Sequence, residues 1–109
     1  MENLNSKVEQ FRKAVTERAD LYAKKNTNYG DSFSQLFAKL GPVSALVPLW
    51  NKLDRITNLV QGGHNDFETV EDSLKDLACY AVMSYLEFKE AHAKKEATSL
   101  GQGNANLLD

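Results

Sequence analysis

The fold is decided by residues 68–88, ETVEDSLKDLACYAVMSYLEF, the longest stretch with a clear helical period. At about 100° per residue, one arc of this helix collects apolar side chains in the pattern typical of a buried face. The members of this stripe are Val70, Leu74, Leu77, Ala81, Tyr85 and Phe88. The sequence therefore predicts an amphipathic helix that packs this stripe into the core.

Three carboxylates recur every four residues on the same helix, at Glu68, Asp72 and Asp76. They share one line on its surface and repel one another by a few tenths of a kcal/mol per exposed pair. A divalent cation, or basic side chains from a facing helix, would offset that repulsion. The first two also suit a helix N-terminus, but Asp76 lies beyond the reach of the helix dipole. We predict either a magnesium site at these three residues or a set of salt bridges.

The composition favours a single all-helical domain. A chain of 109 residues that is 42% hydrophobic has room for one core, and six glycines and two prolines are few helix breakers. A net charge of -2 gives no basic surface for duplex nucleic acid, and no apolar run approaches the roughly 20 residues that span a bilayer. The single cysteine, Cys79, cannot form an internal disulfide, and no signal-peptide pattern opens the chain. We expect a cytoplasmic protein.

Helix signals divide the rest of the chain. A capping box at Ser6 predicts a first helix that ends near residue 25, and a second capping box predicts a short helix over residues 32–40. A third helix is expected from Ser44, with a buried stripe that includes Leu46 and Trp50, to the Gly62-Gly63 pair. The sequence thus predicts a bundle of three long helices and one short helix over residues 1–96, and a flexible tail over 97–109.

Residues 26–33 between the first two helices carry turn chemistry, with Gly30 free to take a positive φ. A plain linker would look similar, but the following helix N-terminus can also bind an anion. Lys52 and Arg55 lie three residues apart on the third helix and point the same way, as phosphate-binding residues would. The predicted ligand-binding residues are Lys25, Asn26, Tyr29, Gly30, Asp31, Ser32, Phe33, Lys52, Arg55 and Tyr80.

Three motifs occur in order along the chain. They are Lys25-Asn-x-x-Tyr-Gly-Asp-Ser-Phe33, Lys52-x-x-Arg-Ile-x-Asn-Leu59 and Glu68-Thr-Val-Glu-Asp-x-x-x-Asp-Leu-Ala-x-Tyr-Ala81. Together they resemble the nucleotide-modification-associated domain 1 family of small phage and bacterial helical proteins. The resemblance covers roughly residues 20–88. It implies a helical fold and a role in nucleotide metabolism or DNA modification.

The acidic last helix is also similar to that of the MazG-like all-α nucleoside triphosphate pyrophosphohydrolases, which bind magnesium through carboxylates. That group carries a Glu-x-x-Glu pair on one helix and a Glu-x-x-Asp pair on the next. This chain offers only Asp54 opposite the acids of its last helix, and Cys79 replaces an asparagine common in the domain 1 family. Both departures weigh against a complete catalytic site.

The predicted ligand is a phosphorylated nucleotide in a cleft of the bundle. Tyr29 would border the base, Gly30 would let the backbone approach, and Lys52 and Arg55 would bind phosphates. The three carboxylates of the last helix would hold magnesium or orient the two basic side chains, Lys52 and Arg55. Three functions stay open: a non-catalytic sponge for a nucleotide signal of bacterial immunity, a magnesium-dependent hydrolase or modification enzyme, and a structural subunit whose charges form only salt bridges.

A homo-oligomer is the remaining prediction. Residues 77–88 contain only one charge, at Glu87, so the last helix is apolar on more than one face. Cys79, Tyr80, Met83 and Leu86 lie away from the stripe assigned to the core. We expect a second copy of the chain to cover them.

Overall fold

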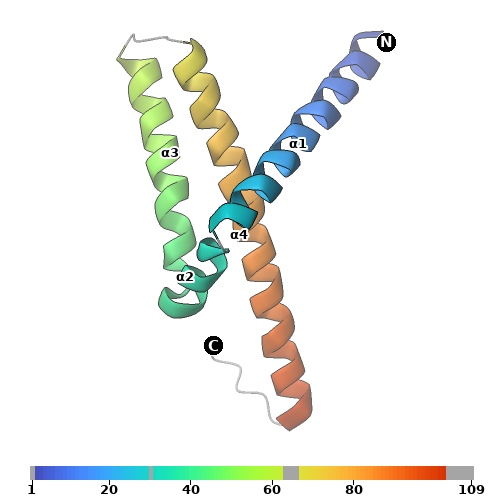
Figure 1. Ribbon diagram of the computed structural model, residues 1–109, viewed down its shortest axis with the longest axis vertical. Coiled ribbons are helices and arrows are strands. Elements are labelled where there is room, and N and C mark those ends of the chain that lie inside the picture. Colours follow the sequence, from blue (N-terminus) through green and yellow to red (C-terminus); the bar gives the residue numbers. More distant parts are fainter. Residues whose placement is uncertain (1, 30, 63–66, 103–109) are drawn as a thin grey trace.

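The computed structural model describes residues 2–29, 31–62 and 67–102, and it is all-helical over these residues. Its four helices are α1 (Glu2–Tyr29), α2 (Ser32–Leu40), α3 (Val43–Gln61) and α4 (Phe67–Gln102), as Figure 1 shows. The predicted all-α architecture of three long helices and one short helix is confirmed. Within the described ranges, no helix is both long enough and apolar enough to cross a membrane.

Helices α3 and α4 form an antiparallel pair that is the most extensive contact in the chain (Figure 1). Small side chains mark where the two helices meet. Ala45 of α3 is fully buried, and Ser73 and Ser84 of α4 are only 3% and 6% exposed. Such small residues let two helix backbones approach closely, so the pair is held by close packing as well as by apolar burial.

Helix α2 crosses one end of the α3–α4 pair. It carries Phe37, the largest buried side chain of the described residues. Phe37 packs edge-to-face against Phe88 of α4, with ring centroids 5.3 Å apart and an angle of 78° between the rings. Phe37 is 8% exposed, and Phe37 and Ala45 are the buried hydrophobic residues of the described chain. The core therefore sits where α2, α3 and α4 meet, and it is small.

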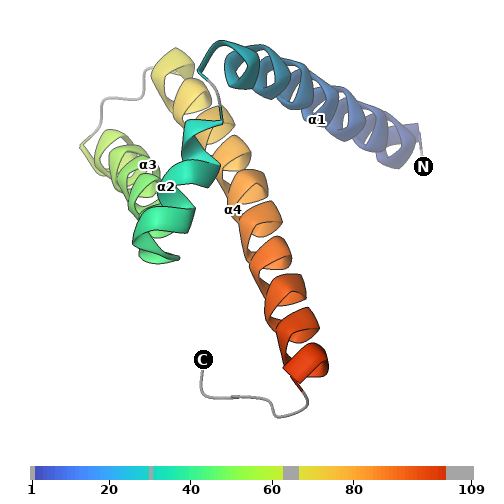
Figure 2. The same ribbon diagram turned by 60° about the horizontal axis from the view of Figure 1, so that its bottom comes forward.

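Helix α1 diverges from the other three, so that its N-terminal end points away from them (Figures 1 and 2). Its apolar stripe is largely in solvent, with Leu4 66%, Phe11 71% and Val15 51% exposed. The radius of gyration is 17.9 Å, whereas a compact domain of this length has about 13 Å. A single chain thus leaves much of its apolar surface uncovered.

The first helix is longer at both ends than predicted. It begins at Glu2 instead of Ser6, and Ser6 accepts a hydrogen bond from the Gln10 side chain, 3.2 Å away, within the helix. It ends at Tyr29 instead of near residue 25. The Thr27 hydroxyl donates to the Ala23 carbonyl at 2.9 Å, one turn back, and this bond is compatible with continued helix. The predicted turn over residues 26–33 is therefore helical up to residue 29 and again from Ser32.

The other helix ends agree more closely with the sequence. Helix α3 begins at Val43, one residue before the predicted start, and the Ser44 hydroxyl donates to the Gly41 carbonyl at 2.7 Å. Gly62 closes α3 as predicted, and its amide donates to the Asn58 carbonyl at 2.9 Å. Helix α4 continues to Gln102, beyond residue 96 where the flexible tail was expected to begin.

The prediction of the buried face of α4 holds only in part. Val70 and Leu77 of the predicted core stripe are half-buried and Phe88 packs on Phe37. Leu74, Ala81 and Tyr85 are exposed, and the face around Ser73 and Ser84 is the buried one. The same holds on α3, where Trp50 is 67% exposed while Ala45 is buried. Hydrophobicity marked the larger side chains, but the close approach of α3 and α4 requires the smaller ones.

Candidate functional site

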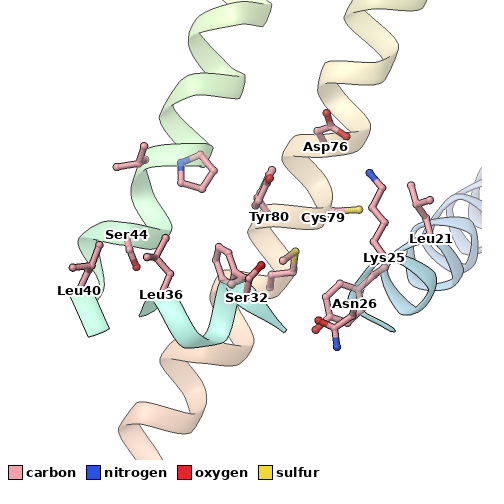
Figure 3. A pocket seen from close by; sticks show the side chains of 15 residues that line it. Leu21, Lys25, Asn26, Ser32, Leu36, Leu40, Ser44, Asp76, Cys79 and Tyr80 are labelled. Atoms are coloured by element: carbon pink, nitrogen blue, oxygen red, sulfur yellow. The ribbon is translucent and has the colours of Figure 1, made fainter. Parts of the chain in front are cut away.

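A cavity of about 800 Å³ opens between the end of α1, α2, the start of α3 and the middle of α4 (Figure 3). Its volume falls within the range of roughly 300–1,000 Å³ that is usual for small-molecule sites. Six predicted site residues line it: Lys25, Asn26, Ser32, Phe33, Asp76 and Tyr80. The structure thus brings together parts of the first and third sequence motifs, which end at residue 33 and begin at residue 68.

One wall of the cavity is aromatic. Phe33 of α2 and Tyr80 of α4 face each other with ring centroids 6.0 Å apart and an angle of 45° between the rings. Both side chains are half-buried, and apolar residues such as Leu36 and Met83 continue the lining. Aromatic walls of this kind bind flat, apolar ring systems by stacking and by burial of surface.

The polar groups of the cavity lie mainly on α1 and α4. Lys25 extends from α1 toward α4, as Figure 3 shows, and the side chain of Asn26 lies on the same helix turn. Asp76 of α4 also lines the cavity, but its carboxylate pairs with the Lys52 amine of α3 at 3.2 Å. The charge of the Asp76 carboxylate is therefore balanced by Lys52. Among the described residues that line the cavity, Lys25 is the one with a positively charged side chain.

A second group of polar side chains lies at the α1–α2–α4 junction. Burial raises the pKa of the Tyr22 phenol above its usual 10.0, and the charges of Asp31 and Glu87 raise it further. The Ser34 hydroxyl donates a hydrogen bond to the Glu87 carboxylate. Tyr22 lines the cavity, whereas Asp31, Ser34 and Glu87 are not among its described lining residues.

The residue before α2 has a positive φ. Asp31 has φ 60° and ψ 41°, a left-handed conformation, and its side chain makes no capping hydrogen bond to α2. Aspartate tolerates this region better than most residues because its short polar side chain can bond locally. Gly30, to which the sequence assigned the turn, lies outside the described residues, as do the side chains of Tyr29 and Glu68.

The remaining predicted residues do not line the cavity. Arg55 is exposed on α3, and Lys52 reaches Asp76 instead of the cavity itself. Asp72 is exposed on α4. Among the side chains that the structure describes, which do not include that of Glu68, no group of three or more His, Cys, Asp or Glu comes together. Because Mg²⁺ can bind through one or two carboxylates, magnesium at Glu68, Asp72 and Asp76 stays a prediction.

The face that the sequence assigned to a subunit interface lies mostly inside the chain. Cys79, Tyr80 and Met83 line the cavity, whereas Leu86 is 46% exposed. Sequence reasoning also missed Tyr22 and Val47, which line the cavity. Tyr22 lies at a helical spacing from the apolar residues of α1, and nothing in a helical period distinguishes a side chain that lines a cavity from one in a packed core.

Comparison of the chain with protein-family models, with curated proteins and with solved structures finds no match. The resemblance to the nucleotide-modification-associated domain 1 family therefore rests on the three sequence motifs, and a function shared with that family is a hypothesis.

Proposed function

We propose that this protein binds a phosphorylated nucleotide in the cavity between α1, α2, α3 and α4. The observation that carries the proposal is the cavity itself, which combines the Phe33–Tyr80 aromatic wall with the Lys25 amine. A nucleotide has a flat base that suits the aromatic wall and a phosphate that suits an amine. The family resemblance implies the same class of ligand.

Binding without chemical change fits the charges better than catalysis does. Asp76 is the one carboxylate among the described cavity-lining residues, and Lys52 already pairs with it at 3.2 Å. A general base or a metal ligand is most effective when its carboxylate is free to accept a proton or bind a cation. We therefore favour sequestration of a nucleotide, for example a signal of bacterial immunity during phage infection, by a cytoplasmic homo-oligomer.

A magnesium-dependent nucleotide hydrolase is the second candidate, because Asp72 lies one helical turn before Asp76 on the same helix. In that case the cation would displace Lys52 from Asp76. The two functions differ in the fate of the ligand. A sponge returns the nucleotide intact when the protein is denatured, whereas an enzyme returns products.

The experiment is to incubate the protein with nucleoside triphosphates and with cyclic and ADP-ribose-type nucleotides, with and without Mg²⁺. The mixtures are separated by chromatography before and after denaturation. Intact nucleotide that is released only on denaturation supports sequestration, and new products support the hydrolase. If no nucleotide of the panel is retained or altered, the proposal is wrong.

Adjacent lysines supply a matched control. Lys25 lines the cavity, and Lys24 is exposed elsewhere on the same helix. Lys25→Gln should weaken binding roughly five- to thirtyfold, the effect of about 1–2 kcal/mol for one charge-assisted hydrogen bond. Lys24→Gln makes the same change in net charge and should leave the affinity unchanged. Equal losses in both variants would place the phosphate outside the cavity.

A further inference from the structure

Two apolar stripes on α3 and α4 stay in solvent. On α3 the stripe consists of Val43, Leu46, Trp50, Leu53 and Val60, which are 49–67% exposed. On α4 it consists of Leu74 and Tyr85, which are 50% and 60% exposed, and of Phe88, which stays 43% exposed beside its contact with Phe37, with Ala78 and Ala81 between them. Both stripes follow the alternating spacing of three and four residues with which helices pack against other helices.

The two stripes lie on the same side of the α3–α4 pair. At about 100° per residue, each stripe is turned by roughly 60–160° from its own contact residue, Ala45 on α3 or Ser73 on α4, in the same rotational sense. Because α3 and α4 run antiparallel (Figure 1), equal rotations bring both stripes to one side. The cavity residues Asp76 and Met83 are turned the opposite way. We name the exposed surface of the eight large residues above the α3–α4 face.

We propose that a second copy of this chain docks on the α3–α4 face and completes a two-fold symmetric four-helix interface. A side chain of this size carries on the order of 150–200 Å². Eight of them, about half exposed, offer roughly 650–900 Å², close to the ~800 Å² per partner of specific complexes. An interface around a two-fold axis uses the same patch on both copies, so one such face suffices.

A second copy fits better than an unrelated partner. The described part of one chain buries only Phe37 and Ala45 among its hydrophobic residues. A core that small needs further burial for stability, and only another copy is present whenever the chain is made. The edges of the face carry charges of both signs, with Asp54 on α3, and Lys89 and the Glu71–Lys75 ion pair on α4. Helix α3 of one copy can therefore lie beside α4 of the other without repulsion.

The wild-type protein offers its own probe of this interface. Trp50 is the one tryptophan of the chain, and it is 67% exposed in a single copy. The proposal expects a mass of about 24 kDa, twice the 12.2 kDa of the chain, by light scattering after gel filtration. It also expects blue-shifted tryptophan emission that acrylamide quenches poorly. A 12 kDa species with fully quenchable Trp50 at high micromolar concentration would overturn it.

Two charge insertions locate the interface. Trp50→Glu should weaken self-association at least a hundredfold and give a monomer. Phe11→Glu places the same charge on the exposed stripe of α1, where Phe11 is 71% exposed, and should leave the dimer intact. Dissociation of the Phe11→Glu variant together with an intact Trp50→Glu dimer would assign the interface to α1 and refute the proposal. If the Trp50→Glu variant loses its helical circular dichroism, it is unfolded and cannot test the interface. Acrylamide quenching of Trp50 fluorescence in the wild-type protein then decides whether the α3–α4 face is covered.

The interface does not depend on the proposed nucleotide binding, because the cavity opens on the other side of the α3–α4 pair. Measuring nucleotide retention on the same variants keeps the two proposals separate. If the protein is dimeric but retains no nucleotide, only the proposed nucleotide binding is refuted. If it is monomeric and retains a nucleotide, only the proposed dimer interface is refuted.

Discussion

The ion pair between Lys52 and Asp76 joins α3 to a carboxylate that lines the cavity, and its strength can be predicted. The two charges are 3.2 Å apart, and their side chains are 31% and 43% exposed. At this distance the Coulomb energy is about 1 kcal/mol in water and about 5 kcal/mol at an effective dielectric constant of 20. Since both groups stay partly in solvent, ordering of the side chains and screening reduce the net coupling to about 1 kcal/mol.

A double-mutant cycle measures that coupling. Lys52→Met and Asp76→Asn are made singly and together, and the free energy of unfolding in urea is measured for all four proteins at one fixed concentration. We expect a coupling of about 1 kcal/mol that falls by at least half in 1 M NaCl. The pair Glu90–Lys94 on α4, 3.3 Å apart and 63% and 75% exposed, is the control. It should give only about 0.3 kcal/mol.

Two results would refute this reasoning. A coupling indistinguishable from zero would mean that Lys52 and Asp76 do not pair in solution. A coupling above about 3 kcal/mol would mean that the pair is desolvated, as in a buried salt bridge. A stabilising effect of Mg²⁺ that is present in Lys52→Met but absent from Asp76→Asn would instead support a magnesium site at Asp76.

Three further predictions concern the scaffold. Gly41→Ala should destabilise the protein by about 1–3 kcal/mol, because Gly41 has φ 85° and ψ -175°, a region open essentially to glycine alone. The control Gly62→Ala, at φ -79°, should be nearly neutral, and equal thermal unfolding temperatures for the two variants would contradict this. Ser84→Ala should be neutral or stabilising by up to about 1 kcal/mol, since this buried hydroxyl has no hydrogen-bond partner in the described structure, and a clear loss in urea unfolding would indicate one. The raised pKa of Tyr22 means that the unfolded chain releases this proton first, so stability is full below pH 10.0 and falls as the pH rises above it. Tyr22→Phe should lessen that alkaline loss in unfolding experiments, and an unchanged pH profile would contradict the assignment.

The number and kind of helices could be predicted from the sequence because the signals that set them are local. The 3.6-residue period needs only the chain itself, and Gly62 ends α3 where a glycine was expected to end it. The end of α1 was harder to predict. Asn26 and Thr27 are compatible both with a turn and with the last turn of a helix, so the sequence alone does not show where the helix ends.

Part of the candidate site could also be read from the sequence. The motif over residues 25–33 and the motif over residues 68–81 on α4 contain the six predicted residues that line the cavity. The sequence could not show that Lys52 pairs with Asp76, because that contact depends on how α3 and α4 are rotated against each other. Nor could the sequence distinguish Tyr22 from a core residue. A helical period shows which face of the helix a side chain is on, but it does not show whether that face borders a cavity or a packed neighbour.

What the sequence by itself determined is therefore the set of four helices and the presence of two apolar arcs on the last one. Only the tertiary structure decided which side of that helix packs inside the chain. The face with the small residues Ser73 and Ser84 turned inward, and the face with Leu74 and Tyr85 stayed exposed. The physical reason is that hydrophobicity fixes how much surface a helix must bury, whereas shape complementarity with its neighbours fixes which surface meets them.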